Sequence, residues 1–185
     1  TVEMMNGMQM INGQAVLFKG VNRHEHDPHK GRTITVGSMI HDIQLMKQFN
    51  LNGVRNCHYP NNYAWYELCT EFGLYMVDEA NIESHGMMFH KDETLANYPD
   101  WEVPFMQRMS RMIARDRNYS AIVTWSMGNE SGYGLNQAAM RERILEMDDT
   151  RPIHFHYADG WKTGSKAEQL GVLISDVKSW MYPSV

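Results

Sequence analysis

Hydrophobic residues along the chain fall into two patterns that alternate. Unbroken apolar runs, each ending in a polar cluster, occupy residues 15–22, 52–60, 74–85 and 121–131. Apolar positions spaced three or four residues apart occupy the following segments, at residues 38–50, 63–72, 101–117 and 135–147. The first pattern predicts buried strands and the second predicts amphipathic helices. Strands that alternate with helices are typical of a parallel sheet covered by helices, so we predict an α/β fold.

The two ends of the chain add further predicted elements. Residues 151–157 and 171–183 are predicted as a fifth and a sixth strand. Residues 1–19 carry two Asn-Gly turn pairs between short alternating runs, which predicts an entry hairpin ahead of the region at 20–185. Ser38 is predicted to cap the start of the first helix, and Gly73 to cap the end of the second.

Two architectures satisfy this alternation, a doubly wound sheet and a (β/α)8 TIM barrel. No GxGxxG follows the first strand, which leaves a dinucleotide-binding fold with little support. Polar clusters after all of the first four strands favour the barrel, whose active site collects at the carboxyl ends of its strands. A complete barrel has eight strands in about 250 residues. We therefore predict an incomplete barrel, about six of the eight β/α units, cut from a longer protein.

Composition narrows the partners and the compartment. The net charge of -5 and the pI of about 6.0 argue against a nucleic-acid surface, and no apolar segment is long enough to span a membrane. The two cysteines lack a CxxC spacing and no signal peptide opens the chain, which favours a reducing, cytoplasmic location. An open sheet would expose two strand edges, so we expect a homo-oligomer.

The polar clusters are rich in carboxylates, imidazoles and amides. In chain order they contain His24, Glu25 and His26; Arg55 and His58; Asp78, Glu79, Asn81, Glu83 and His85; and Asn129 and Glu130. These groups suit acid/base chemistry on a polyhydroxylated ligand. Glycoside hydrolysis with retention needs two carboxyl groups about 5 Å apart, and Glu130 is our candidate proton donor. The competing interpretation of Glu130 is a carboxylate that caps the next helix.

Several of these residues have more than one plausible role. Glu83 and His85 would face the same way on an extended segment, and a mixed carboxylate and imidazole pair suits Mg²⁺ or Mn²⁺; the alternative is a solvent-facing pair. The segment "HEHDPH" is either a metal-binding tract or a hydrogen-bonded loop cluster. Trp65 and Trp125 either stack on a sugar or pack in the core.

Four motifs in fixed order resemble the catalytic domain of glycoside hydrolase family 2, most closely its beta-galactosidase branch. They are "FKGVNRHEHDP", "VRNCHYPNN", "GLYMVDEANIESHGM" and "WSMGNESGYG", and the resemblance runs from about Gly7 to Tyr182. The departures include Cys57, which stands where the family usually has serine, and "NYSAIVTW", which replaces a more usual Asn-His-Pro before the fourth strand. Neither changes a residue of the proposed site.

The resemblance implies a TIM barrel that hydrolyses terminal beta-D-galactosides with retention. By position in the motifs, Glu130 would be the acid/base. An active-site Mg²⁺ would be held by Glu83, His85 and Glu130. The sugar would be contacted by His24, His58 and Asn129. In this family the nucleophilic glutamate lies at the end of the seventh strand, and most ligands of a monovalent cation also lie outside the matched stretch. We therefore predict that this chain lacks the nucleophile. It should be inactive without the remaining domains of its parent.

Other functions stay open at this point. A related family 2 exo-glycosidase would act on another beta-linked sugar. A non-catalytic carbohydrate-binding module would bind galactose without hydrolysing it. A structural metal-binding module would lose its fold with a chelator, which two acidic ligands and one imidazole make a poor explanation.

Overall fold

A small antiparallel sheet opens the chain. The computed structural model describes residues 1–88, 94–156, 174–177 and 179. The small sheet consists of β1 (Val2–Met5), β2 (Met8–Ile11) and β3 (Gln14–Ala15). Asn6-Gly7 and Asn12-Gly13 connect its strands with positive φ at both residues of each pair, between +49° and +77°. This is the backbone that favours Asn-Gly in two-residue turns, so the predicted hairpin is confirmed and a third strand extends it.

The main sheet is parallel, and its strands lie in the order in which they occur in the chain. They are β4 (Gly20–Arg23), β5 (Gly53–Asn56), β6 (Tyr75–Glu79), β7 (Ile122–Ser126) and β8 (Ile153–His154). The connecting helices are α1 (Val36–Gln48), α2 (Tyr63–Phe72), α3 (Glu102–Asp116) and α4 (Leu135–Met147). Three short 3₁₀ helices precede α3, at His85–Met87, Leu95–Asn97 and Pro99–Trp101. An order without reversal is that of a (β/α) barrel and not of a doubly wound sheet.

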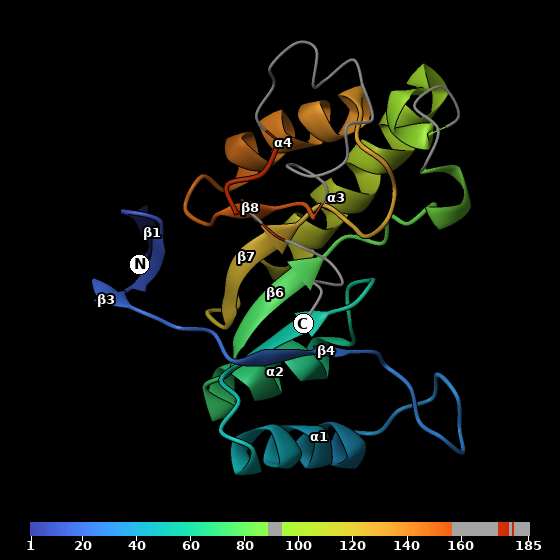
Figure 1. The fold of residues 1–185 in the computed structure, drawn as a ribbon. Helices are drawn as coiled ribbons and strands as arrows, with labels where there is room; N and C mark the ends of the chain where they lie inside the picture. Colours follow the sequence, from blue (N-terminus) through green and yellow to red (C-terminus); the bar gives the residue numbers. More distant parts are fainter. Residues whose placement is uncertain (89–93, 157–173, 178, 180–185) are drawn as a thin grey trace, which may run out of the picture.

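The barrel is open in the described part of the chain. Figure 1 shows α1 and α2 beside the β4 end of the sheet and α3 and α4 beside the β8 end, with the small sheet near the starts of the strands. The described residues form five strands of this sheet, where the sequence predicts six. Most of the predicted sixth strand, 171–183, lies outside the described residues. Its described part reaches the sheet, because Val177 forms a parallel bridge with His154.

Two predicted element boundaries are wrong. The run at 15–22 is not one strand, since β3 ends at Ala15 and β4 begins at Gly20. The first helix is capped by Thr35 and not by Ser38: the Thr35 hydroxyl accepts from the Ser38 backbone N–H at 3.2 Å, and the Ser38 hydroxyl accepts from the Thr35 N–H at 3.1 Å. The predicted cap at Gly73 is confirmed, with φ of +67°.

The apolar core lies between the strands and the helices. It contains Met39 and Ile43 of α1, Trp65 of α2, Met109 and Ile113 of α3, and Val54, Met76 and Ile122 of the sheet. Trp65 and Trp125 are both fully buried, which favours the packing role over sugar stacking. Their indole N–H groups donate to Asn56 Oδ1 and Asp148 Oδ2 at 2.9 and 3.0 Å, so the buried polar atoms are satisfied.

Strand alternation also places a predicted site residue in this layer. Asp78 points toward the helices, because Glu79 beside it faces the inside of the barrel. The Tyr66 hydroxyl donates to Asp78 Oδ1 at 2.8 Å, and Asn56 Nδ2 donates to the same oxygen at 3.2 Å. Burial and the neighbouring Asp116 raise the pKa of Asp78 well above its usual value. Asp78 is therefore a core carboxyl and does not belong to the site, contrary to its place in the predicted cluster.

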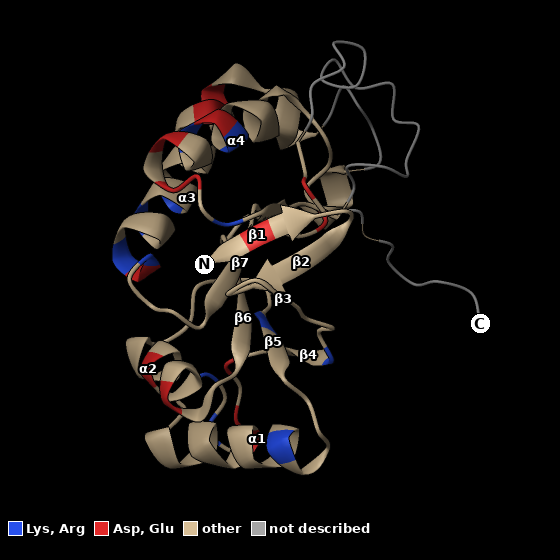
Figure 2. Cartoon of the chain, turned by 90° about the vertical axis from the view of Figure 1, so that its left-hand side faces the viewer, with Lys and Arg blue, Asp and Glu red and all other residues tan. Residues whose placement is uncertain are grey.

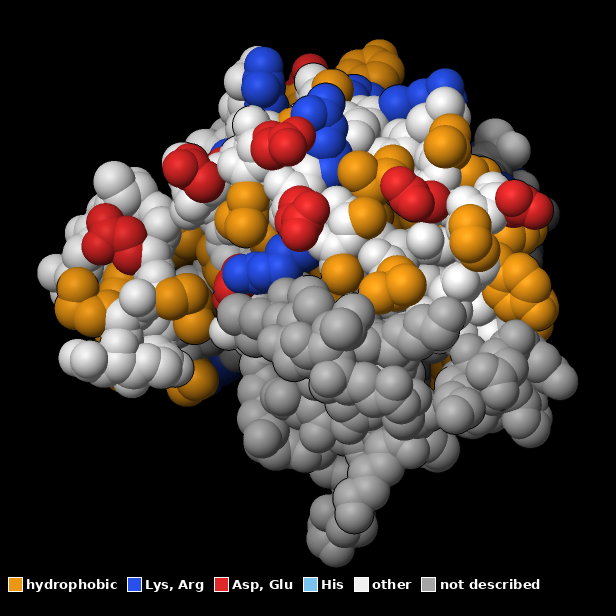
Figure 3. Space-filling model, turned by 90° about the horizontal axis from the view of Figure 1, so that it is seen from above, with side chains coloured by type: hydrophobic (Ala, Val, Ile, Leu, Met, Phe, Trp, Pro, Cys, Tyr) orange, Lys and Arg blue, Asp and Glu red, His pale blue; other side chains and the backbone are white. Residues whose placement is uncertain are grey.

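Charged residues are concentrated on the helices and mixed in sign. Figure 2 shows acidic and basic positions mainly on α1 to α4, and Figure 3 shows both signs interspersed on the face seen from above. Among the described residues, no helix is long and apolar enough to cross a membrane.

The Asp78→Asn variant should be at least as stable as the original chain at neutral pH. A carboxyl whose pKa is raised by folding costs stability as the pH rises above its unfolded value of about 3.8, and the amide removes that cost while keeping the acceptor oxygen. The difference should vanish below about pH 4. Asp78→Ala, the matched control, loses both hydrogen bonds and should cost about 1–3 kcal/mol in urea unfolding. A marked loss of stability in Asp78→Asn at pH 7 would show that the ionised form is the stabilising one.

Candidate active site at the carboxyl ends of the strands

One side chain from each strand of the main sheet joins a hydrogen-bonded row on its inner face. The members are Asn22 of β4, Arg55 of β5, Glu79 of β6, Ser126 of β7 and His154 of β8. Alternate side chains of a strand point to the same face of the sheet, so residues far apart in the sequence become neighbours on that face when their strands pair. Asn22 pairs with Arg55 and Ser126 with His154 in the strand register, and Glu79 pairs with Ser126.

Glu79 is the centre of this row. Its carboxylate is fully buried and accepts from Arg55 Nε at 2.8 Å, Arg55 Nη2 at 2.9 Å and the Ser126 hydroxyl at 2.6 Å. His58 Nδ1 lies 2.7 Å from Glu79 Oε1. Burial alone would raise the pKa of Glu79, but the hydrogen bond from His58 and the charge of Arg55 outweigh it, and the pKa is lowered. The carboxylate is thus ionised and holds four donors.

These contacts determine which ring nitrogen of His58 carries a proton. An ionised carboxylate only accepts, so Nδ1 of His58 donates to Glu79. The 3.3 Å approach of Arg55 Nη2 to the same nitrogen is then a contact between two donors and not a hydrogen bond. Nε2 of His58 is left to meet a ligand, and the half-buried ring is held in place for that contact.

The same arginine orients the amide of Asn129. Arg55 Nη2 lies 2.9 Å from Asn129 Oδ1, and because a guanidinium has no acceptor, the carbonyl oxygen must face it. The NH₂ group of Asn129 therefore points away from Arg55 and is the side that can donate to a hydroxyl. Asn129 is buried, so its donor direction is set before any ligand arrives.

Glu130 occupies an unusual backbone position. Its φ is +31°, a region that non-glycine residues rarely adopt and that is concentrated at functional sites. A Cβ at Gly128, with φ of +126°, would lie 2.5 Å from the carbonyl oxygen of Ile82, so only glycine fits there. The Asn129 N–H donates to that carbonyl at 2.9 Å, and the Glu130 carbonyl accepts from Ser84. Two of the sequence motifs are thereby joined side by side.

Glu130 does not cap the following helix, because α4 begins after Gly134. Its backbone N–H donates to Nε2 of His156 at 2.9 Å, and burial lowers the pKa of His156 to about 3, which keeps that ring neutral. Its carboxylate Oε2 lies 2.8 Å from Nδ1 of the exposed His85. Glu130 is therefore a buried carboxyl in contact with a solvent-exposed imidazole.

The predicted magnesium ligands are only partly brought together. His85 and Glu130 are in contact, and their donor atoms, an imidazole nitrogen and carboxylate oxygens, fit Mg²⁺ or Mn²⁺. Glu83 lies two residues before His85 on an exposed segment. Within the described residues, the three side chains do not form a group with all donor atoms within 4.8 Å of one another, so Glu83 lies farther than that from at least one of the other two.

The "HEHDPH" segment forms a hydrogen-bonded cluster around loop residues. Asp27 Oδ1 accepts from the backbone N–H groups of His29 and Lys30 at 2.8 and 2.9 Å. His24 Nδ1 lies 3.3 Å from the hydroxyl of Tyr59, and its ring packs edge-on to that of His58 with 5.3 Å between centroids. Of the residues predicted to contact a sugar, His24 and His58 are thus adjacent. Asn129 is connected to them only indirectly, because Arg55 lies against both Asn129 and His58.

The sequence motifs do not single out the residues that support the site. Glu79 belongs to a predicted polar cluster without an assigned role, and Ser126, His154 and His156 stand outside the predicted site residues. The alternation of side chains along a strand could have indicated two of them, because Glu79 and Ser126 stand at the last inward-facing positions of β6 and β7. His154 is partly buried, and burial lowers its pKa to about 4, so it serves the row as a neutral ring.

Comparison with known proteins agrees with this architecture. Residues 2–185 match the family described as "Glycosyl hydrolases family 2, TIM barrel domain". The chain belongs to glycoside hydrolase family 2. The family inferred from the four motifs is confirmed, as is the incomplete TIM barrel.

Curated family 2 relatives are named beta-galactosidases. One from Yersinia enterocolitica is 51% identical over 154 residues, which cover 83% of this chain and 14% of its own length. One from Pectobacterium atrosepticum is 47% identical over 169 residues, 91% of this chain and 16% of its own length. The chain therefore spans about a sixth or less of these relatives.

Solved structures of similar fold include beta-glucuronidases. The enzyme from Dictyoglomus thermophilum has a TM-score of 0.71 and 25% identity, covering 83% of this chain and 28% of that one. A Ruminococcus gnavus enzyme in complex with C6-substituted uronic isofagomine has a TM-score of 0.70 and 26% identity, covering 83% and 27%.

The Glu79→Gln variant should lose about 3 kcal/mol of folding free energy at pH 7. Removing one partner of a buried ion pair leaves Arg55 uncompensated, and the partial exposure of Arg55 places the cost at the low end of the usual range. Because folding lowers the pKa of Glu79, its stabilisation is present above about pH 4.5 and is lost as the pH falls through the folded value. Urea unfolding at several pH values measures this.

The exposed Glu67→Gln on α2 is the control and should change stability by less than about 0.5 kcal/mol. Equal behaviour of the two variants would mean that the ion pair contributes nothing.

Proposed function

We propose that this chain is the part of a retaining exo-beta-galactosidase that supplies the acid/base and the sugar-contacting residues. The observation that carries this is the presentation of Asn129 and Glu130 together at the end of β7, with the Asn129 amide oriented by Arg55. Glu130 adopts a strained backbone beside it. Identity of 47–51% to proteins named beta-galactosidase, against 25–26% to the two glucuronidases, supports galactose as the sugar.

In the proposed reaction Glu130 exchanges a proton with the substrate. As a carboxylic acid it protonates the glycosidic oxygen while the bond to the anomeric carbon breaks; as a carboxylate it then takes a proton from the water that releases the sugar. Nε2 of His58 and the NH₂ group of Asn129 would contact sugar hydroxyls. His24, whose ring packs edge-on to that of His58, would contact the sugar next to it. Each of these groups is held by a partner other than the substrate, which reduces the entropy lost on binding.

A retaining mechanism also needs a nucleophilic carboxylate. Glu79 is the buried glutamate closest to His58, but its oxygens are engaged by Arg55, His58 and Ser126, so it is unsuited to attack a sugar. We place the nucleophile outside these 185 residues. The chain would then require the remaining strands and domains of the parent protein for turnover, and the parent's monovalent cation would also be held mostly by residues outside it.

We place Mg²⁺, or Mn²⁺ in its stead, at Glu83, His85 and Glu130. When bound, the ion would supply positive charge next to the carboxyl group that exchanges the proton. His85 already touches Glu130, so binding requires the exposed Glu83 segment to approach this pair.

Two other functions share part of this support. The similarity in fold to glucuronidases also supports a family 2 enzyme that acts on another sugar. Hydrolysis rates on a panel of beta-glycosides distinguish such an enzyme from a galactosidase. The preformed His58 and Asn129 contacts would equally serve a binding module, which would bind galactose but release no product.

The Glu130→Gln variant tests the acid/base role in the chain continued through the remaining barrel strands and domains. Loss of a general acid should lower the rate about 10²–10⁴-fold for a galactoside with a poor leaving group. In kcat/KM, which covers only the steps up to departure of the leaving group, the loss should be much smaller for a dinitrophenyl galactoside, whose leaving group needs no proton. Rates on the two substrates measure this difference, and the 185-residue chain alone should hydrolyse neither.

Glu67→Gln again serves as control and should retain full activity on both substrates. An equal loss of kcat/KM in Glu130→Gln on both substrates would assign Glu130 a structural role. Turnover by the 185-residue chain alone, abolished in Glu130→Gln, would show that a nucleophile lies within it. Galactose binding without hydrolysis by the extended protein would favour the binding module.

Mg²⁺ binding should depend on both Glu83 and His85. We expect Glu83→Gln and His85→Ala each to weaken binding of Mn²⁺, used as a spectroscopic substitute, by at least roughly tenfold in an electron paramagnetic resonance titration. Unchanged binding in Glu83→Gln would remove Glu83 from the ligand set.

A further inference from the structure

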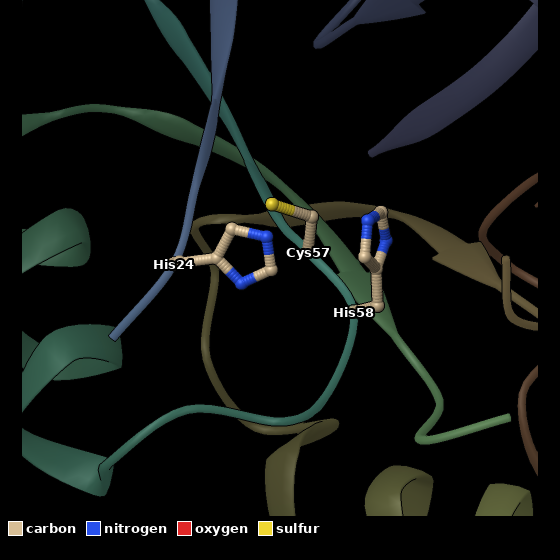
Figure 4. A group of neighbouring side chains, drawn as sticks. All are labelled: His24, Cys57 and His58. Atoms are coloured by element: carbon tan, nitrogen blue, oxygen red, sulfur yellow. The ribbon is translucent and has the colours of Figure 1, made fainter. Parts of the chain in front are cut away.

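A second group of side chains with metal-ligand chemistry differs in its donor atoms from the proposed magnesium ligands. His24, Cys57 and His58 each offer a donor atom, and these atoms all lie within 4.8 Å of one another. Figure 4 shows the thiol of Cys57 and the two imidazole rings gathered around one region. In the described part of the chain no other three such residues meet this condition.

The sheet register explains why these three meet. β4 and β5 are paired so that Arg23 lies opposite Asn56. His24 and Cys57 are therefore the first residues past the ends of two neighbouring strands, and His58 follows directly. The group rests on the ends of the sheet and not on a loop of its own, which holds its donors in place before an ion arrives.

Both histidines have a hydrogen-bond partner on their other ring nitrogen. Nδ1 of His58 donates to the buried carboxylate of Glu79 at 2.7 Å, and Nδ1 of His24 lies 3.3 Å from the Tyr59 hydroxyl. A carboxylate or hydroxyl behind the imidazole is the usual support of a metal-ligating histidine, because it sets the tautomer and strengthens the ligand. It leaves Nε2 of each ring to bind.

An ordinary cysteine thiol carries its proton at neutral pH, and the form that binds a metal is the thiolate. Coordination would form one metal–sulfur bond, break the S–H bond and release one proton to the solvent.

We propose that His24, Cys57 and His58 form a binding site for one Zn²⁺ ion, with a water molecule as the fourth ligand. Two imidazoles and a thiolate are ligands for Zn²⁺ and not for Mg²⁺, which prefers oxygen. The ion would take the position that His24 and His58 are proposed to offer a sugar, so Zn²⁺ would inhibit hydrolysis by the parent protein. That consequence rests on the proposed function, whereas the binding of Zn²⁺ does not.

Titration with Co²⁺, followed by displacement with Zn²⁺, tests the site in the 185-residue chain. We expect one equivalent of Co²⁺ to produce a thiolate-to-metal charge-transfer band, and Zn²⁺ to abolish it. Zn²⁺ calorimetry in two buffers of different ionisation enthalpy should show one proton released per ion. No charge-transfer band, or no proton release, would overturn the proposal.

The chain contains a matched control for the thiol. Cys57→Ser should lose the band and bind Zn²⁺ at least roughly tenfold more weakly, whereas Cys69→Ser, which removes the buried thiol of α2, should behave like the original chain. Equal affinity in Cys57→Ser would contradict the proposal. His24→Gln, at an exposed position, provides a second test if Cys57→Ser fails to fold, as judged by circular dichroism, and it should show the same weakening.

The parent protein separates this proposal from the proposed function. Zn²⁺ inhibition that Cys57→Ser relieves would support both. Zn²⁺ binding without inhibition would support the metal site and contradict the sugar contact by His24 and His58.

Discussion

The ion pair between Glu79 and Arg55 is the interaction on which the other side chains of the site depend. A fully buried carboxylate is costly unless every oxygen is satisfied, and Glu79 meets this condition with donors from β5, β7 and the loop after β5. Arg55 also donates hydrogen bonds to Asn22 and Asn129. One pair thus determines the tautomer of His58 and the amide direction of Asn129, although neither Glu79 nor Arg55 need touch a substrate.

The opposite face of the same strands shows why adjacent acidic residues have unlike roles. Asp78 and Glu79 are neighbours in the sequence, and both are fully buried. Burial and the neighbouring Asp116 raise the pKa of Asp78, whereas the hydrogen bond from His58 and the charge of Arg55 lower the pKa of Glu79. Consecutive residues of a strand point to opposite faces of the sheet, and this alternation decides which carboxyl is neutral and which is charged. It therefore also decides which one can organise a polar site.

The architecture and the place of the site could be predicted from the sequence because they follow from local patterns. Apolar runs that end in polar clusters indicate parallel strands, and Asn-Gly pairs indicate the turns of the small sheet. The supporting contacts could not be predicted, since the row from Asn22 to His154 requires the relative register of five strands. Thr35 was overlooked for a related reason: Thr35 and Ser38 are both good capping residues, and only the backbone shows which one precedes the first turn.

The support provided by Glu79 is not specific to one ligand. A carboxylate that holds Nδ1 of His58 directs Nε2 outward, and an outward imidazole nitrogen can meet either a sugar hydroxyl or a metal ion. What decides between them is the third side chain beside His24 and His58. A hydroxyl at position 57 would add a weak ligand and favour the sugar. The thiol of Cys57 adds a strong one, so a single atom opens the site to a competing cation.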